Sequence, residues 1–190
     1  MLDADNKQFA YEMLRDRETY HSQKENAANA VFLLETGLFG ALVAATSKAQ
    51  ITEFASMSNW GFALLVVFVW CLLHVFMRWQ LRNRRIAALQ VATLVNALND
   101  HLSGKPLQDG SSQNLPSSCH CFDFLDYFVP RPQATVISDV ALERHPDWYR
   151  EQFLAVQKRG TGASFGEIFP TYGSITMLVF ALSYVLLLSR

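Results

Sequence analysis

The chain has 190 residues, of which 51% are hydrophobic and 17% charged, and its formal net charge is −1. The near-zero charge argues against a general nucleic-acid binder, which carries a basic excess, and three cysteines are too few for a disulfide framework. The apolar residues gather in three runs, at 28–46, 60–77 and 173–188. This pattern predicts an all-α integral membrane protein with three transmembrane helices.

The first 27 residues are polar and carry both charge signs, unlike a signal peptide, so we expect the first apolar run to stay in the protein as a span. Phe9, Met13 and Tyr20 recur at helical spacing. We therefore predict an amphipathic helix over residues 1–27 that continues into transmembrane helix 1 at 28–46. No Pro or Gly precedes Gly37, and the two segments are expected to form one helix from about Asp5 to Thr46.

The first span carries small residues on one face and an acid on the other. In lipid, small residues three and four apart let helix backbones approach closely, so they predict a helix-packing surface. Glu35 lies about seven residues inside the apolar run, roughly opposite this face. The small-residue face consists of Gly37, Gly40, Ala41, Ala44 and Ala45.

An outer loop at 47–59 leads into transmembrane helix 2 at 60–82. From Trp60 to Met77 there is no formal charge, and these residues span about 27 Å as helix, close to the roughly 30 Å of a bilayer core. Trp favours the membrane boundary, and arginines mark the exit of the span. The predicted interface anchors are Trp60, Trp79, Arg78, Arg82, Arg84 and Arg85.

The positive-inside rule orients all three spans in the same way. Basic residues precede the first span, follow the second and precede the third, whereas the 47–59 loop has only one. We expect the N-terminus and residues 83–171 to be cytoplasmic and the C-terminus to lie at the outer face of a membrane, which we take to be a bacterial inner membrane.

Beyond the second span, apolar residues continue at spacings of three and four from Ile86 to Leu102. They predict a cytoplasmic stalk helix at 83–102 that pairs with the N-terminal helix in a long antiparallel hairpin. A single N-terminal helix is not expected to cover the whole apolar stripe of the stalk. The uncovered part favours self-association.

The rest of the chain divides into three predicted segments. Residues 103–118 are rich in Gly, Ser, Pro and Asn and predict a flexible linker. Residues 119–171 predict a small cytoplasmic helical unit, in which Pro146 opens a helix that Gly160 ends. Transmembrane helix 3 follows at 172–190, with Thr176 and Ser183 on the face expected to pack against other helices.

Glu35 and His74 are the most informative pair, because ionisable residues inside a membrane are expensive. Antiparallel spans would place the two residues in the same layer. Three interpretations stay open. A bond of Glu35 with His74 or Arg78 would lock the hairpin, or Glu35 would snorkel to the interface; the pair would line an oligomeric pore; or it would form a proton-coupled site.

Cys119, His120 and Cys121 resemble part of a metal site, but tetrahedral zinc takes four ligands and no second Cys/His pair follows. We predict no metal and no cofactor. The Gly-rich stretch at 160–166 lacks the Lys and Ser/Thr of a phosphate-binding loop. No catalytic motif occurs, so we expect a protein that is not an enzyme.

Two close spans with helical cytoplasmic extensions resemble the arrangement of bacterial SLATT-type membrane effectors. The resemblance covers residues 5–102 as architecture, transfers no site residues, and implies an effector that acts on a membrane. We therefore expect a self-associating pore or membrane-perturbing channel subunit, with the lipid bilayer and further copies of the chain as partners. The alternative is a membrane adaptor that recruits a cytosolic protein through the stalk and residues 119–160.

Overall fold

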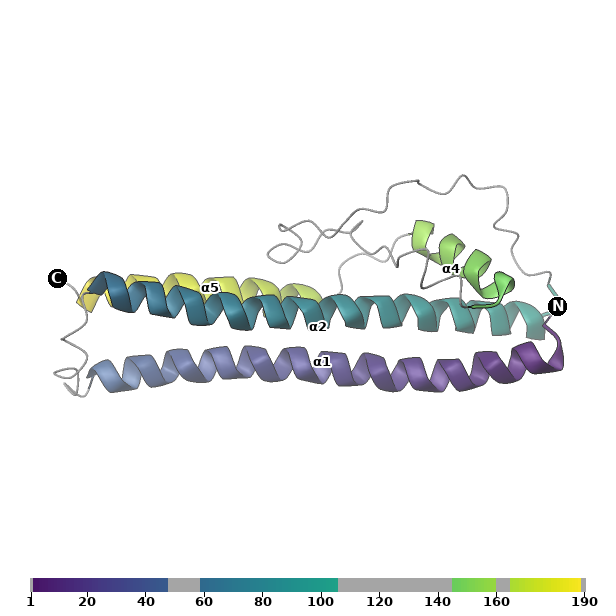
Figure 1. The fold of residues 1–190 in the computed structure, drawn as a ribbon, viewed down its shortest axis with the longest axis horizontal. Helices are drawn as coiled ribbons and strands as arrows, with labels where there is room; N and C mark the ends of the chain where they lie inside the picture. The colour runs from purple at the N-terminus through teal and green to yellow at the C-terminus, as the bar shows by residue number, and fades with distance from the viewer. Residues whose placement is uncertain (1, 48–58, 106–144, 160–164, 189–190) are drawn as a thin grey trace.

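The computed structural model describes residues 2–47, 59–105, 145–159 and 165–188, and these residues form four α-helices and no strand (Figure 1). The helices are α1 (Ala4–Ser47), α2 (Asn59–Leu102), α4 (Asp147–Arg159) and α5 (Phe165–Leu188). The predicted all-α class is confirmed for this part of the chain. Three of the helices, α1, α2 and α5, are long and apolar enough to cross a membrane.

Local capping sets the ends of the two longest helices. Asp3 opens α1, because its carboxylate accepts the backbone N–H of Asn6 at 2.8 Å. Gly104 closes α2 with a φ of 65°, a conformation that costs glycine little. The N–H of Lys105 then donates to the carbonyl of Asp100 at 2.9 Å. Both helices agree with the sequence prediction to within about one residue at each end.

The last helix begins earlier than the sequence predicts. It starts at Phe165 rather than at residue 172, and Pro170 lies inside it. Glu167 and Pro170 interrupt the apolar run, so hydropathy alone places the start of the helix too late. The first seven residues of α5 therefore belong to the predicted small unit by sequence but to the long helix by structure.

Contacts pair the beginning of α1 with the end of α2, and the helices lie side by side along their length (Figure 1). The N–H of Leu2 donates to Nδ1 of His101 at 3.2 Å, and Glu25 pairs with Arg84 at 3.2 Å. Further along, Ala28 is buried in a cluster with Met77 and Leu81. Helix α5 contacts both α1 and α2.

Helix α4 completes the core at the end of the bundle where α1 begins. Tyr149 and Phe153 of α4 are fully buried with Leu94 of α2 and Ala10 of α1. The indole N–H of Trp148 donates to Oδ1 of Asn6 at 2.9 Å. Thus α1 and α4 together cover most of the apolar stripe of the stalk. The uncovered part is smaller than the sequence predicts, so it supports self-association less strongly.

Most of the predicted outer loop (residues 48–58), most of the 103–118 linker, and Cys119, His120 and Cys121 lie outside the described residues. The same is true of Gly160, the predicted end of α4.

Candidate functional site

Two polar faces meet where α2 lies against α5. On α2, Trp70, His74 and Arg78 follow one another at intervals of four residues, which places them on one side of the helix. On α5, Glu167, Thr171 and Ser174 follow at intervals of four and three. We call these six residues the polar layer.

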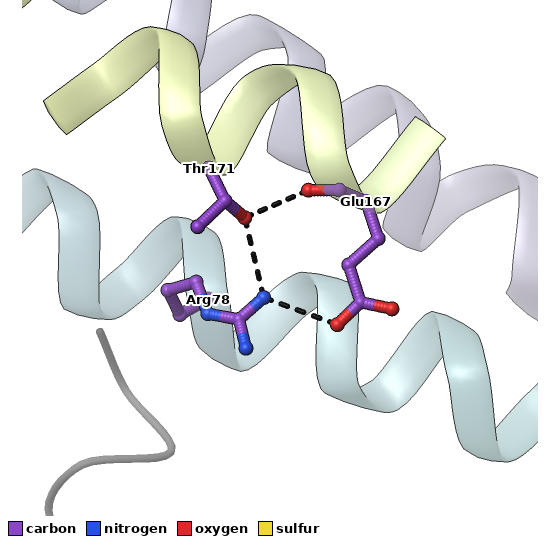
Figure 2. Close-up of polar contacts among 3 residues, drawn as sticks. All are labelled: Arg78, Glu167 and Thr171. Carbon is purple, nitrogen blue, oxygen red and sulfur yellow. Dashed lines mark hydrogen bonds and ion pairs between the residues drawn. The ribbon is translucent and has the colours of Figure 1, made fainter. Parts of the chain in front are cut away.

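Arg78 joins the two helices at one end of the polar layer (Figure 2). Its Nη1 donates to Oε1 of Glu167 at 3.1 Å and to Oγ1 of Thr171 at 3.2 Å. The Thr171 hydroxyl in turn donates to the backbone carbonyl of Glu167 at 2.7 Å. All three side chains are buried. A buried ion pair needs such additional hydrogen bonds, because both charges have left water.

Ser174 organises the other end of the polar layer. The indole N–H of Trp70 donates to both the carbonyl oxygen and Oγ of Ser174, at 2.9 and 3.0 Å. Nδ1 of His74 lies 2.9 Å from the same Oγ. The rings of Trp70 and His74 also stack, with centroids 4.6 Å apart. His74 is therefore held from two sides in a fixed position.

Glu35 of α1 faces this layer and is buried, with 6% of its surface exposed. The Ser174 hydroxyl lies near its carboxylate, but that hydroxyl is engaged by Trp70 and His74. Neither carboxylate oxygen of Glu35 accepts a hydrogen bond of normal geometry from the described residues, and the Ser174 hydroxyl is the donor that comes near it. Of the interpretations left open above, a bond from Glu35 to His74 or Arg78 does not form, because His74 is held by Ser174 and Arg78 by Glu167, both on α5.

Snorkelling of Glu35 is also contradicted, since the side chain is buried. Glu35 and His74 nevertheless approach the same neighbour, Ser174, from two helices. The bundle thus brings the predicted pair into one region without joining them directly.

The small-residue face of α1 points away from the other described helices. Gly37, Gly40, Ala41 and Ala44 are exposed, and a Cβ atom built on Gly37 or Gly40 would meet nothing within 4 Å. Thr176 and Ser183 of α5 are exposed as well. The face of α5 that contacts α1 and α2 is therefore not the face that the sequence predicts to pack. The packed face of α5 instead carries Thr171, Ser174, Ala181 and Val185.

The predicted interface anchors occupy both ends of the apolar part of α2. Trp60 and Trp79 are exposed, and Nζ of Lys24 lies 5.7 Å from the Trp79 ring centroid. Arg78 differs from the other arginines because it is buried in the polar layer, whereas Arg82, Arg84 and Arg85 are half-buried. Its role in the structure is to pair with Glu167.

Four members of the polar layer are not predicted from the sequence: Trp70, Glu167, Thr171 and Ser174. The available signal is the spacing of polar residues from 167 to 174, which matches one helical face only if the helix begins before residue 167. A late start for α5 hides that pattern.

No group of three or more His, Cys, Asp and Glu side chains comes together among the described residues in a way that would hold a metal. Comparison with protein-family models, curated proteins and solved structures finds no match for this chain.

Proposed function

We propose that this chain is a non-enzymatic integral membrane protein that self-associates through α1 and acts as a subunit of a pore or membrane-perturbing assembly. The observation that carries the proposal is the small-residue face of α1. Gly37 and Gly40 are exposed on a helix of membrane-spanning length, with open space where a side chain would be. In lipid, such a face lets a second helix approach closely.

The proposed arrangement is an antiparallel hairpin of α1 and α2, rooted in a bacterial inner membrane with α5 as the third span. The pairing of Leu2 with His101 and of Glu25 with Arg84 supports the hairpin. The basic residues near Lys24 and Arg84 support a cytoplasmic location for the end that carries α4. The C-terminus then lies at the outer face.

The position of the polar layer bears on how such an assembly would act. Its six side chains lie between α2 and α5 of one chain, so they support the bundle rather than a lining between copies. The outward faces of the spans carry mainly Leu, Val, Phe and small residues. An assembly that perturbs the membrane needs only these outward faces in contact with lipid. A pore that conducts ions would also need α2 and α5 to separate, so that the polar layer becomes accessible to water.

Replacing both glycines by Leu tests the proposal. Gly37→Leu with Gly40→Leu should leave the folded monomer intact, since nothing lies within 4 Å of either Cβ position. We expect the oligomer measured by mass photometry in nanodiscs to shift to monomer, and ion flux into liposomes to fall with it. Val179→Leu, at an exposed position of α5, is the matched control and should change neither.

An unchanged oligomer in the double glycine variant would refute the proposed interface. A wild-type chain that is monomeric and silent in the flux assay would refute the assembly itself.

The second candidate function is a membrane adaptor, and the docking of α4 favours it. Phe153 and Tyr149 fix α4 against α1 and α2, which gives the end of the bundle a defined surface. An adaptor would bind a soluble protein with the monomer, and the double glycine variant would bind that protein as well as the wild type does.

A further inference from the structure

A cavity of about 200 Å³ lies between α1, α2 and α5, next to the polar layer. Glu35, Trp70 and Leu73 line it at the end near the polar layer, and Leu42, Leu65 and Ala181 line it toward the other end. Apart from Glu35 and the indole of Trp70, its walls are aliphatic side chains, Phe and Met. An engineered cavity of about 150 Å³ holds benzene, so this one has room for a small organic molecule.

Glu35 places a carboxyl group in the otherwise apolar wall of the cavity. The side chain is buried, and the one donor near its carboxyl group among the described residues is the Ser174 hydroxyl, which Trp70 and His74 also engage, so no cation balances Glu35 within this part of the chain. Holding this carboxylate ionised without a partner would be unfavourable by several kcal/mol, in order of magnitude. A cationic N–H donor placed in the cavity would supply both the missing charge and the missing hydrogen bonds.

Trp70 lines the cavity beside Glu35. Its indole N–H is already used by Ser174, so what it adds to the cavity wall is aromatic surface. The stacking on His74 and the bond to Ser174 fix the ring in place.

The exposed lining residues show where the cavity opens. Leu38 of α1 is 46% exposed, and Leu65 and Val69 of α2 are 45% and 38% exposed. In the proposed membrane arrangement these side chains face lipid, so a molecule would enter from the bilayer. The ligand must therefore have an apolar body as well as a cationic head.

We propose that this cavity binds a small hydrophobic amine, with its ammonium group on Glu35 and its apolar body along the walls from Leu73 to Leu65. The proposal rests on the membrane insertion proposed above but not on self-association, because one chain supplies every lining residue. Phosphatidylethanolamine carries an amine too, but its phosphate would be buried against walls in which the described part of the chain places no cationic residue. The site is therefore assigned to an amine without a phosphate.

The test uses the full chain in phosphatidylcholine nanodiscs, with 4-phenylbutylamine as the probe and 4-phenylbutanol as its neutral analogue. Co-elution of the chain with the discs that persists at high salt and alkaline pH, where a peripherally bound chain is released, tests insertion separately. We expect saturable binding of the amine with one site per chain, about tenfold or more tighter than the alcohol. Glu35→Gln should weaken amine binding by a similar factor and leave the alcohol unchanged. Glu12→Gln, an exposed carboxylate of α1, should change neither.

Equal affinity for amine and alcohol, unchanged binding in Glu35→Gln, or no saturable binding above that of empty discs would each overturn the proposal. Displacement of the probe by phosphatidylethanolamine in the discs would overturn the assignment to a small amine. Ala181→Leu gives a second variant that keeps Glu35 but fills the cavity from α5. It should lose the amine, and wild-type binding by this variant would also refute the site.

Discussion

Arg78 and Glu167 meet at 3.1 Å inside the bundle, and only 6% and 5% of their side chains are exposed. Another ion pair joins Arg84 to Glu25 at 3.2 Å, with 14% and 34% of the side chains exposed. The distances are nearly the same, but the surroundings differ. Burial, rather than distance, should therefore decide how much each pair matters to stability.

Glu167→Gln should destabilise the fold by about 3–5 kcal/mol, the usual cost of leaving one partner of a buried pair uncompensated. The loss comes from Arg78, whose charge would remain buried after its counter-ion is removed. Unfolding in mixed micelles by increasing SDS, followed by far-UV circular dichroism, measures the effect.

Glu25→Gln is the matched control, and its loss should be smaller, about 1 kcal/mol, because water reaches the half-buried Arg84 pair and screens it in part. Equal losses in the two variants would contradict the conclusion that burial decides how much each pair contributes to stability.

Gly173→Ala should weaken the contact of α5 with α1. A Cβ atom at this position would lie 2.7 Å from Cε2 and 2.8 Å from Cζ of Phe32, closer than packed atoms tolerate. We expect a loss of about 1–3 kcal/mol, as overpacking usually costs. The same unfolding assay measures it. Phe32→Leu in the Gly173→Ala background should recover part of the loss, and no recovery would show that Phe32 is not the obstacle.

Phe153→Ala should release α4 from the bundle. The side chain is fully buried among residues of α1 and α2, and truncation of a buried Phe costs about 3–5 kcal/mol. Faster amide hydrogen exchange confined to residues 147–156 is the expected signature. Arg150→Ala, at a half-buried position of the same helix, should leave exchange unchanged. Faster exchange throughout α2 would instead mean that α4 holds the whole bundle together.

Acidification should destabilise the protein partly through His21 of α1. Burial, and next the positive charge of Arg84, lower the pKa of His21 below its ordinary value of 6.5. The folded state therefore disfavours the protonated form, so the contribution of His21 is fully present above pH 6.5 and is lost as the pH falls below that value. The unfolding midpoint should drop between pH 7.5 and 5.5, and His21→Gln should reduce the drop. An identical drop in the variant would assign the pH dependence to other groups.

The first and last residues of a helix can be predicted from the sequence where an uninterrupted run of helix formers or a single proline marks them. The uninterrupted apolar and charged helix formers of α1 and α2 predict both helices, and Pro146 predicts the start of α4. The partners of the polar side chains do not follow in the same way. His74 and Glu35 are visible as polar residues in apolar runs, but the hydroxyl that holds His74 belongs to Ser174, about 100 residues away along the chain. Only the tertiary packing of α5 selects it.

The length of α2 has a mechanical consequence. This helix runs for 44 residues without a proline, about 66 Å at 1.5 Å per residue. Phe153 of α4 packs near its end, while Trp70 and His74 lie in its other half, held by Ser174. A continuous helix resists compression along its axis, so α2 keeps a fixed distance between the α4 contact and the Trp70–His74 contact. A push on α4 that displaces α2 along its axis would move the stacked rings of Trp70 and His74 by the same amount.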